Sequence, residues 1–258
     1  MKPIEILPVK KAFVKPDNLN PILPSHPFLE IVISPPRGGK SNALINKILN
    51  PELYYNGKGE NPSYFDEIFW LSPTSKFDFT TKEALKKLDI VHQINDPDEL
   101  VQSDVLLTEI MKEQADADED DRKKILIVFD DMVGIIDKLP KLQQLATKFR
   151  HFSLSIIIVS QSYRKIPNTI RNCITSIMLF DLKNAKEFEK IYDEIGSGVP
   201  LWNELVERSV KKRYDFVYFN VEKQEMYHCY KKLLWSRDMD DPDKKGYFTK
   251  PLSQATSS

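Results

Sequence analysis

The sequence predicts an α/β fold with a mainly parallel central sheet, and three observations lead to this class. Continuous apolar runs occur at 28–33, 125–131 and 154–161, as in parallel strands that helices cover on both faces. Between these runs lie stretches whose apolar residues recur at helical spacing. Each run also ends in a polar or glycine-containing segment, where open α/β sheets bind their ligands.

The expected elements alternate along the chain. Strands are expected at 28–33, 66–72, 90–94, 125–131, 154–161 and 176–180. Helical patterns occupy 41–49, 80–88, 96–114, 141–150, 166–173, 184–195 and 200–210. Two short alternating strands, at 214–221 and 225–230, predict a C-terminal edge hairpin.

These elements fill one predicted domain at 28–232. Residues 1–27 contain six prolines and predict an extended arm. We favour a strap over the domain surface, with an arm that reaches a neighbouring subunit as the alternative. Residues 233–258 are expected to form a polar C-terminal tail.

Composition limits the classes of function. The chain has 258 residues, of which 41% are hydrophobic and 29% charged, as in an ordinary globular protein. A net charge of -1 gives no overall basic field, so any contact with DNA would depend on local charge. The cysteines, Cys173 and Cys229, form neither a disulfide framework nor a familiar zinc spacing. No signal peptide or membrane-spanning run is evident, so we expect an intracellular protein.

The segment 34–42, SPPRGGKSN, has the layout of a phosphate-binding loop between a strand and a helix. Successive N–H groups at a helix start form a nest for anions. Lys40 would reach the β- and γ-phosphates of ATP, and the Ser41 hydroxyl would ligate Mg²⁺. Expected nucleotide contacts are Ser34, Pro35, Pro36, Arg37, Gly38, Gly39, Lys40, Ser41 and Asn42.

Ser34 is a departure from the usual loop, which has Gly at this position. Pro35 and Pro36 also lack N–H donors, so the donors expected to face phosphate come from 37–41. We interpret the segment as a working variant with a stiffened start. The alternative is a glycine-rich turn that merely precedes a helix.

Two later strand ends supply the other groups that nucleotide chemistry needs. Asp130 ends an apolar strand, where it can bind the Mg²⁺ held by Ser41, and Asp131 can activate the attacking water. Gln161 ends the next apolar strand and can contact the γ-phosphate or the water. The alternative for each is an ordinary polar residue at a strand end.

Hydrolysis also requires a cation for the charge that develops on the γ-phosphate, often an arginine from a neighbouring subunit. Arg150 and Arg171 are the leading candidates, with Arg164 behind them. Each could equally be a surface arginine. The basic segment 211–213 and the polar loop 56–63 are weaker candidates for DNA contact.

The motifs SPPRGGKS, ILIVFDD and IIIVSQSYRKIPNTIRN together resemble the poxvirus-type genome-packaging ATPases of large DNA viruses and virophages, in the FtsK–HerA superfamily of P-loop NTPases. The resemblance spans 28–230. It implies a RecA-like three-layer sandwich with an edge hairpin. By this resemblance, Lys40 and Ser41 are the Walker A pair, Asp130 and Asp131 the Walker B pair, and Gln161 the sensor.

The resemblance also implies an activity and partners. ATP and Mg²⁺ would be the cofactors, and hydrolysis would drive double-stranded DNA into a capsid. A homo-oligomeric ring would act with capsid or portal-vertex proteins, in the host cytoplasm, in a viral factory or on the virion. Two other classes stay open: a nucleoside or polynucleotide kinase, and a P-loop scaffold that binds nucleotide without hydrolysis.

Overall fold

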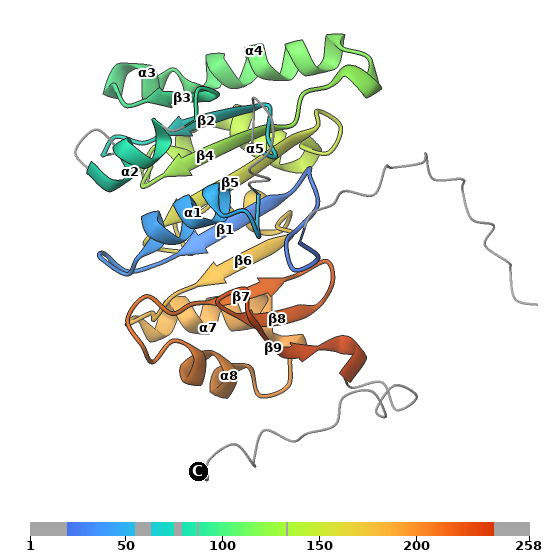
Figure 1. Cartoon of the computed structure of the whole chain (residues 1–258). Coiled ribbons are helices and arrows are strands. Elements are labelled where there is room, and N and C mark those ends of the chain that lie inside the picture. The colour runs from blue at the N-terminus through green and yellow to red at the C-terminus, as the bar shows by residue number, and fades with distance from the viewer. Residues whose placement is uncertain (1–19, 55–62, 75–78, 87, 133, 240–258) are drawn as a thin grey trace, which may run out of the picture.

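A computed structural model describes residues 20–54, 63–74, 79–86, 88–132 and 134–239. In these residues a single nine-stranded sheet has the order β3-β2-β4-β5-β1-β6-β7-β8-β9 (Figure 1). The strands from β3 to β6 are parallel, and β7, β8 and β9 are antiparallel to their neighbours. The predicted α/β class with a mainly parallel sheet is therefore confirmed.

The strands follow the apolar runs closely. Their bounds are β1 (Leu29–Ile33), β2 (Glu67–Leu71), β3 (Val91–Ile94), β4 (Ile125–Asp130), β5 (Leu154–Ser160), β6 (Ser176–Leu179), β7 (Val217–Asn220), β8 (Glu225–His228) and β9 (Lys232–Ser236). The helices are α1 (Lys40–Leu49), α2 (Phe79–Leu85), α3 (Pro97–Val101), α4 (Ser103–Asp116), α5 (Pro140–Lys148), α6 (Asn168–Arg171), α7 (Ala185–Glu194) and α8 (Trp202–Ser209).

Two apolar clusters, one on each face of the sheet, make three layers. In β4, Ile127 joins the cluster beneath α4, α5, α7 and α8, whereas its neighbour Val128 joins the cluster beneath α1 and α2. This division follows because successive side chains of a strand point to opposite faces. Both faces are thus buried, which explains why β1, β4 and β5 are continuous apolar runs.

The helix expected at 96–114 is wrong as one element, because α3 ends before α4 begins. The Ser103 hydroxyl donates a hydrogen bond to the carbonyl of Leu100, 2.6 Å away. Gln102 between the helices has φ -88° and ψ 10°, outside the helical region. The serine side chain thus provides a hydrogen bond to a carbonyl near the break, in competition with the backbone bonds of a continuous helix. The spacing of apolar residues does not reveal this competition.

The C-terminal antiparallel unit is larger than the predicted hairpin. β7 and β8 form that hairpin, and β9 extends it to the sheet edge. β9 was not predicted, and Trp235 within it is buried, so the sheet continues past the expected boundary at 232. The tail residues 240–258 lie outside the described residues.

The described end of the proline-rich segment packs as a strap. Leu23 is buried, and the Tyr54 hydroxyl donates a hydrogen bond to the Pro24 carbonyl at 2.7 Å. Lys223 donates to the carbonyl of Pro21, and a ring nitrogen of His26 lies 2.7 Å from the Ser155 hydroxyl. These contacts fit the favoured interpretation for residues 20–27, whereas residues 1–19 lie outside the described part.

Candidate functional site

The polar ends of three neighbouring strands meet at one edge of the sheet. β5 lies between β1 and β4, and all three run parallel, so their carboxyl ends are adjacent. The segment after β1 leads into α1, and the residues after β4 and β5 face it. The topology therefore brings together segments that are about 90 to 120 residues apart in sequence.

Lys40 lies between the two aspartates. Its Nζ atom is 3.9 Å from Asp130 Oδ1 and 3.6 Å from Asp131 Oδ1. The Gln161 side chain donates a hydrogen bond from Nε2 to that same Asp131 oxygen at 3.1 Å. A chain of contacts thus links four of the predicted site residues.

The two aspartates have different surroundings. Asp130 ends β4, its side chain is only 7% exposed, and the Ser72 hydroxyl approaches its Oδ2 at 3.5 Å. Asp131 is 25% exposed and has a left-handed backbone, with φ 57°. The turn of the chain at Asp131 separates the two carboxylates, so one is enclosed and the other is open to a reactant.

The loop itself has a closed turn before the helix. The Gly38 N–H donates to the Pro35 carbonyl at 3.1 Å, and the Ser34 hydroxyl donates to the same carbonyl at 3.1 Å. A Cβ on Gly38 would lie 2.2 Å from Ser34 Oγ and 3.0 Å from the Pro35 carbonyl oxygen, so any larger residue at 38 would force this turn to shift. Gly39 has φ 102°, and α1 begins at Lys40.

Ser41 and Asn42 lie in the first turn of α1, where backbone N–H groups have no acceptor within the helix. Those groups point toward the segment that precedes the helix, as an anion site requires. Arg37 belongs to the loop and has a left-handed φ of 60°. The predicted loop residues are therefore arranged around a helix N-terminus that faces the Lys40 and Asp130 side chains.

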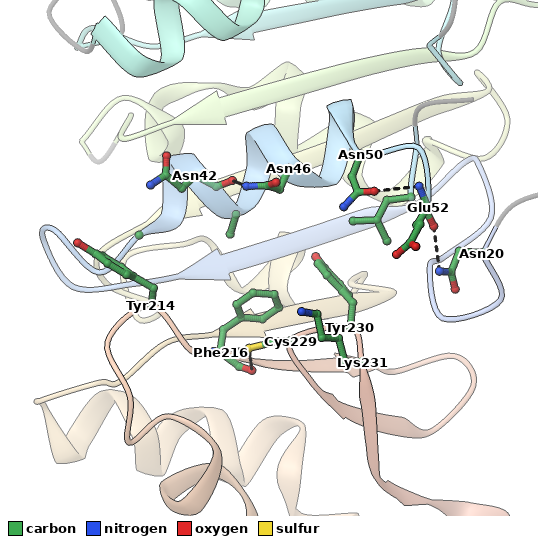
Figure 2. Close-up of a pocket in the computed structure, with 13 residues that line it drawn as sticks. Asn20, Asn42, Asn46, Asn50, Glu52, Tyr214, Phe216, Cys229, Tyr230 and Lys231 are labelled. Carbon is green, nitrogen blue, oxygen red and sulfur yellow. Dashed lines mark hydrogen bonds between the residues drawn. The ribbon is translucent and has the colours of Figure 1, made fainter. Parts of the chain in front are cut away.

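A cavity of about 340 Å³ lies beside α1 (Figure 2). Gly39, Asn42 and Asn46 line it from the helix side. The opposite wall comes from the C-terminal antiparallel unit and consists of Tyr214, Phe216, Cys229, Tyr230 and Lys231. A second cavity, of about 300 Å³, is lined by loop residues 35–38 and by the basic segment 211–213.

The comparison with protein families identifies one match. The model of the family described as "Poxvirus A32 protein" matches residues 84–198, which include Asp130, Asp131 and Gln161. This match agrees with the predicted resemblance to poxvirus-type genome-packaging ATPases. No curated protein matches the chain.

Solved structures share the fold. The genome-packaging NTPase B204 of Sulfolobus turreted icosahedral virus 2, in complex with ATP-γ-S, has a TM-score of 0.54 and 16% identity over 78% of this chain and 96% of that chain. The cytoplasmic domain of the type VII secretion ATPase EccC from Thermomonospora curvata has a TM-score of 0.53 and 14% identity, over 78% of this chain and 25% of that chain. These likenesses confirm the P-loop NTPase fold of this chain.

The two arginine candidates lie in other clusters. Arg171 is 10% exposed, forms an ion pair with Glu194 at 3.0 Å and stacks over the Tyr163 ring. Burial raises the pKa of Glu194, but hydrogen bonds from Lys190 and Tyr163 and the charge of Arg171 lower it overall. Arg150 is 59% exposed and pairs with Glu222. Arg150 is therefore the more accessible of the two.

Ser72 is a site residue that the sequence analysis missed. It follows β2, and its N–H donates to the Ile94 carbonyl while its hydroxyl faces Asp130. The signal was available, because the apolar run at 66–72 also ends in a polar residue. β2 pairs in parallel with β4, so that residue reaches the same edge of the sheet.

Proposed function

We propose that this chain is an ATPase that moves viral double-stranded DNA into a capsid. The observation that carries the proposal is the convergence of Lys40, Asp130, Asp131 and Gln161 at the carboxyl ends of adjacent strands. The match to the poxvirus A32 family and the likeness to a viral genome-packaging NTPase support a packaging ATPase.

The residues present fit Mg²⁺. The Lys40 ammonium lies within 4 Å of both aspartates, so the negative charge of this pair attracts cations. The Ser41 hydroxyl and the Asp130 carboxylate offer the oxygen ligands that Mg²⁺ prefers. When bound, the ion would neutralise charge on the phosphate oxygens.

In the proposed reaction, the residues of the chain position water against the γ-phosphate. Asp131 accepts a proton from the water, while the Gln161 amide holds the Asp131 carboxylate in place. The water oxygen bonds to the γ-phosphorus, the bond to the bridging oxygen breaks, and ADP leaves. Lys40 and the N–H groups at the start of α1 stabilise the charge that develops.

The cavity beside α1 is suited to the nucleoside part of ATP. It begins at Gly39 and Asn42, directly next to the loop. The Tyr214 and Phe216 side chains on its far wall can contact a base through their rings, and the Asn46 amide can form hydrogen bonds with it (Figure 2).

The proposed motor is a homo-oligomeric ring in which a neighbour supplies the arginine. Arg150 is the better candidate because it is exposed, whereas Arg171 is enclosed by Glu194 and Tyr163. Duplex DNA and capsid or portal-vertex proteins are the proposed partners, in the host cytoplasm, in a viral factory or on the virion. Within the described residues no helix is long and apolar enough to cross a bilayer.

Phosphate release with and without duplex DNA tests this function. We expect DNA to stimulate the wild type and Lys40→Ala to lose at least about 100-fold in rate. Lys86→Ala is the matched control, since Lys86 is exposed and pairs only with Glu83 among the described residues. Equal rates in the wild type and Lys40→Ala would refute the proposal.

A screen of phosphate acceptors, in the same samples, separates the other classes. Transfer to a nucleoside or polynucleotide in place of water would indicate a kinase. Nucleotide binding without turnover, with or without DNA, would indicate a scaffold. Particle mass measured in parallel reports whether the active form is a ring.

A further inference from the structure

In the part of the chain that the structure describes, one group of side chains has the spacing of metal ligands. It consists of Asp215, His228 and Cys229, whose ligand atoms all lie within 4.8 Å of one another. His228 Nε2 is 3.1 Å from Asp215 Oδ2, and Cys229 Sγ is 3.8 Å from Asp215 Oδ1. This group has no part in the proposed hydrolysis, although Cys229 also lines the cavity proposed for the nucleoside.

The strands hold the three residues in place. Asp215 lies just before β7, His228 is the last residue of β8, and Val217 pairs with His228 across the two strands. The Cys229 N–H donates to the Phe216 carbonyl at 3.1 Å, which continues the ladder by one pair. His228 lies on a strand, and Asp215 and Cys229 lie within two residues of strand ends, so all three are held more firmly than ligands on a free loop.

The donor separations are near those of a tetrahedral zinc site. With the usual bond lengths to Zn²⁺, a nitrogen and an oxygen ligand lie about 3.3 Å apart, and a sulfur and an oxygen about 3.6 Å. The observed separations are 3.1 Å from His228 Nε2 to Asp215 Oδ2 and 3.8 Å from Cys229 Sγ to Asp215 Oδ1, so the two contacts use different oxygens of the carboxylate. The three ligand atoms lie within 4.8 Å of one another, and a rotation of the Asp215 carboxylate would present one oxygen to both neighbours.

His228 provides an independent observation. Its Nε2 atom is buried and forms no hydrogen bond within the described residues, although the Asp215 carboxylate is 3.1 Å away. The ring nitrogen therefore does not point at the carboxylate oxygen as a hydrogen-bond donor would. A buried nitrogen without a hydrogen bond is costly, and a metal ion between the two groups would remove that cost.

The donor set selects the class of metal. A thiolate and an imidazole favour Zn²⁺, whereas Mg²⁺ and Ca²⁺ prefer sites made of oxygen ligands. Burial raises the pKa of the Cys229 thiol, and the charge of Asp215 adds to that rise. Because zinc binds the thiolate, binding of Zn²⁺ would release the proton of the thiol.

We propose that Asp215, His228 and Cys229 bind a zinc ion, with a fourth position left for water. The site joins the start of β7 to the turn between β8 and β9. Tyr214 and Phe216, on either side of Asp215, line the cavity beside the phosphate-binding loop, as does Cys229 (Figure 2). Zinc would thus fix the wall of that cavity that the C-terminal strands supply.

Cobalt spectroscopy on the tag-free, full-length chain tests this site. After treatment with a chelator, the wild type should bind one Co²⁺ with tetrahedral visible bands and a thiolate-to-cobalt band, and Zn²⁺ should remove both. Cys229→Ser should lose the thiolate band, and Cys173→Ser is the matched control that should keep it. No thiolate band in the wild type, or an unchanged band in Cys229→Ser, would overturn the proposal.

A second measurement does not depend on the folding of a variant. In the wild type, Zn²⁺ should slow the alkylation of Cys229 at least tenfold and leave the rate at Cys173 unchanged. Mass spectrometry of the labelled peptides separates the two sites. Equal rates at Cys229 with and without Zn²⁺ would overturn the proposal, whatever the ATPase activity of the same sample.

Discussion

Lys47 and Glu30 form an ion pair wholly inside the protein, and removal of one charge should destabilise the fold. Lys47 Nζ, on α1, lies 2.5 Å from Glu30 Oε2, on β1, and both side chains are fully buried. The Ser176 hydroxyl donates a second hydrogen bond to that oxygen at 2.7 Å. Nζ also lies between 5.4 and 5.7 Å from the ring centres of Phe28, Tyr54, Tyr218 and Tyr230.

The informative change is Glu30→Gln, which keeps the side-chain size but leaves the ammonium without its counter-charge. Burial lowers the pKa of Lys47, and Glu30 acts against that shift. Removal of one partner from a buried pair costs about 3–5 kcal/mol. In a chain of this length each kcal/mol corresponds to about 2–4 °C, so we expect the Tm to fall by about 6–20 °C.

A double variant shows whether the charge or the shape matters. Glu30→Gln combined with Lys47→Met removes both charges, and such replacements are often neutral. The double variant should therefore recover most of the lost stability, with a coupling energy of at least about 2 kcal/mol. Thermal and urea unfolding, followed by circular dichroism, measure the effect, with Lys86→Met as an exposed control.

Two results would refute this reasoning. The first is a Tm of Glu30→Gln within about 2 °C of the wild type. The second is a double variant whose loss equals the sum of the two single losses, since independent sites add and coupled sites do not.

Three further changes test other parts of the structure. Gly39→Ala should weaken ATP binding about tenfold or more, as measured by calorimetry. The added methyl would lie 2.7 Å from Tyr214 Cδ1, and residue 39 has a φ of 102°. An unchanged affinity would contradict this geometry. Gln161→Ala should lower kcat about 100-fold and leave the ATP Kd unaltered, and a normal kcat would remove Gln161 from the reaction. Arg171→Ala should lower the free energy of unfolding by about 2–3 kcal/mol and Arg150→Ala by less than about 1 kcal/mol. The reverse order in urea unfolding would show that Arg150 supports the fold.

The parallel sheet and the candidate phosphate site could be predicted because their signals are local. The runs that contain β1, β4 and β5 each end in the residues that meet at the sheet edge. In open α/β sheets the ligand lies at the carboxyl ends of the strands. This rule predicts that Lys40, Asp131 and Gln161 lie together, and it requires no information about distant contacts.

The rest depended on contacts between residues that are far apart in sequence. Glu30 is a charge within an apolar strand, and such a charge requires a buried partner, yet no pattern identifies Lys47 as that partner. β9 has the sequence KLLWS, and its apolar stretch of two leucines and a tryptophan is too short to distinguish from a tail. The cluster of Asp215, His228 and Cys229 exists only because β7 and β8 pair.

The place of β1 between β5 and β6 affects how the protein is made. The contacts that enclose the start of β1 join residues separated by 127 positions, for Phe28 and Ser155, and by 146, for Leu29 and Thr175. On the ribosome, the GGKS segment therefore emerges long before either neighbouring strand. Pairing across such separations is slow, and the apolar residues of β1 stay exposed to aggregation in the interval. Because β1 lies at the centre of the sheet, the loop that follows it should reach its folded conformation only after β5 and β6 have been synthesised.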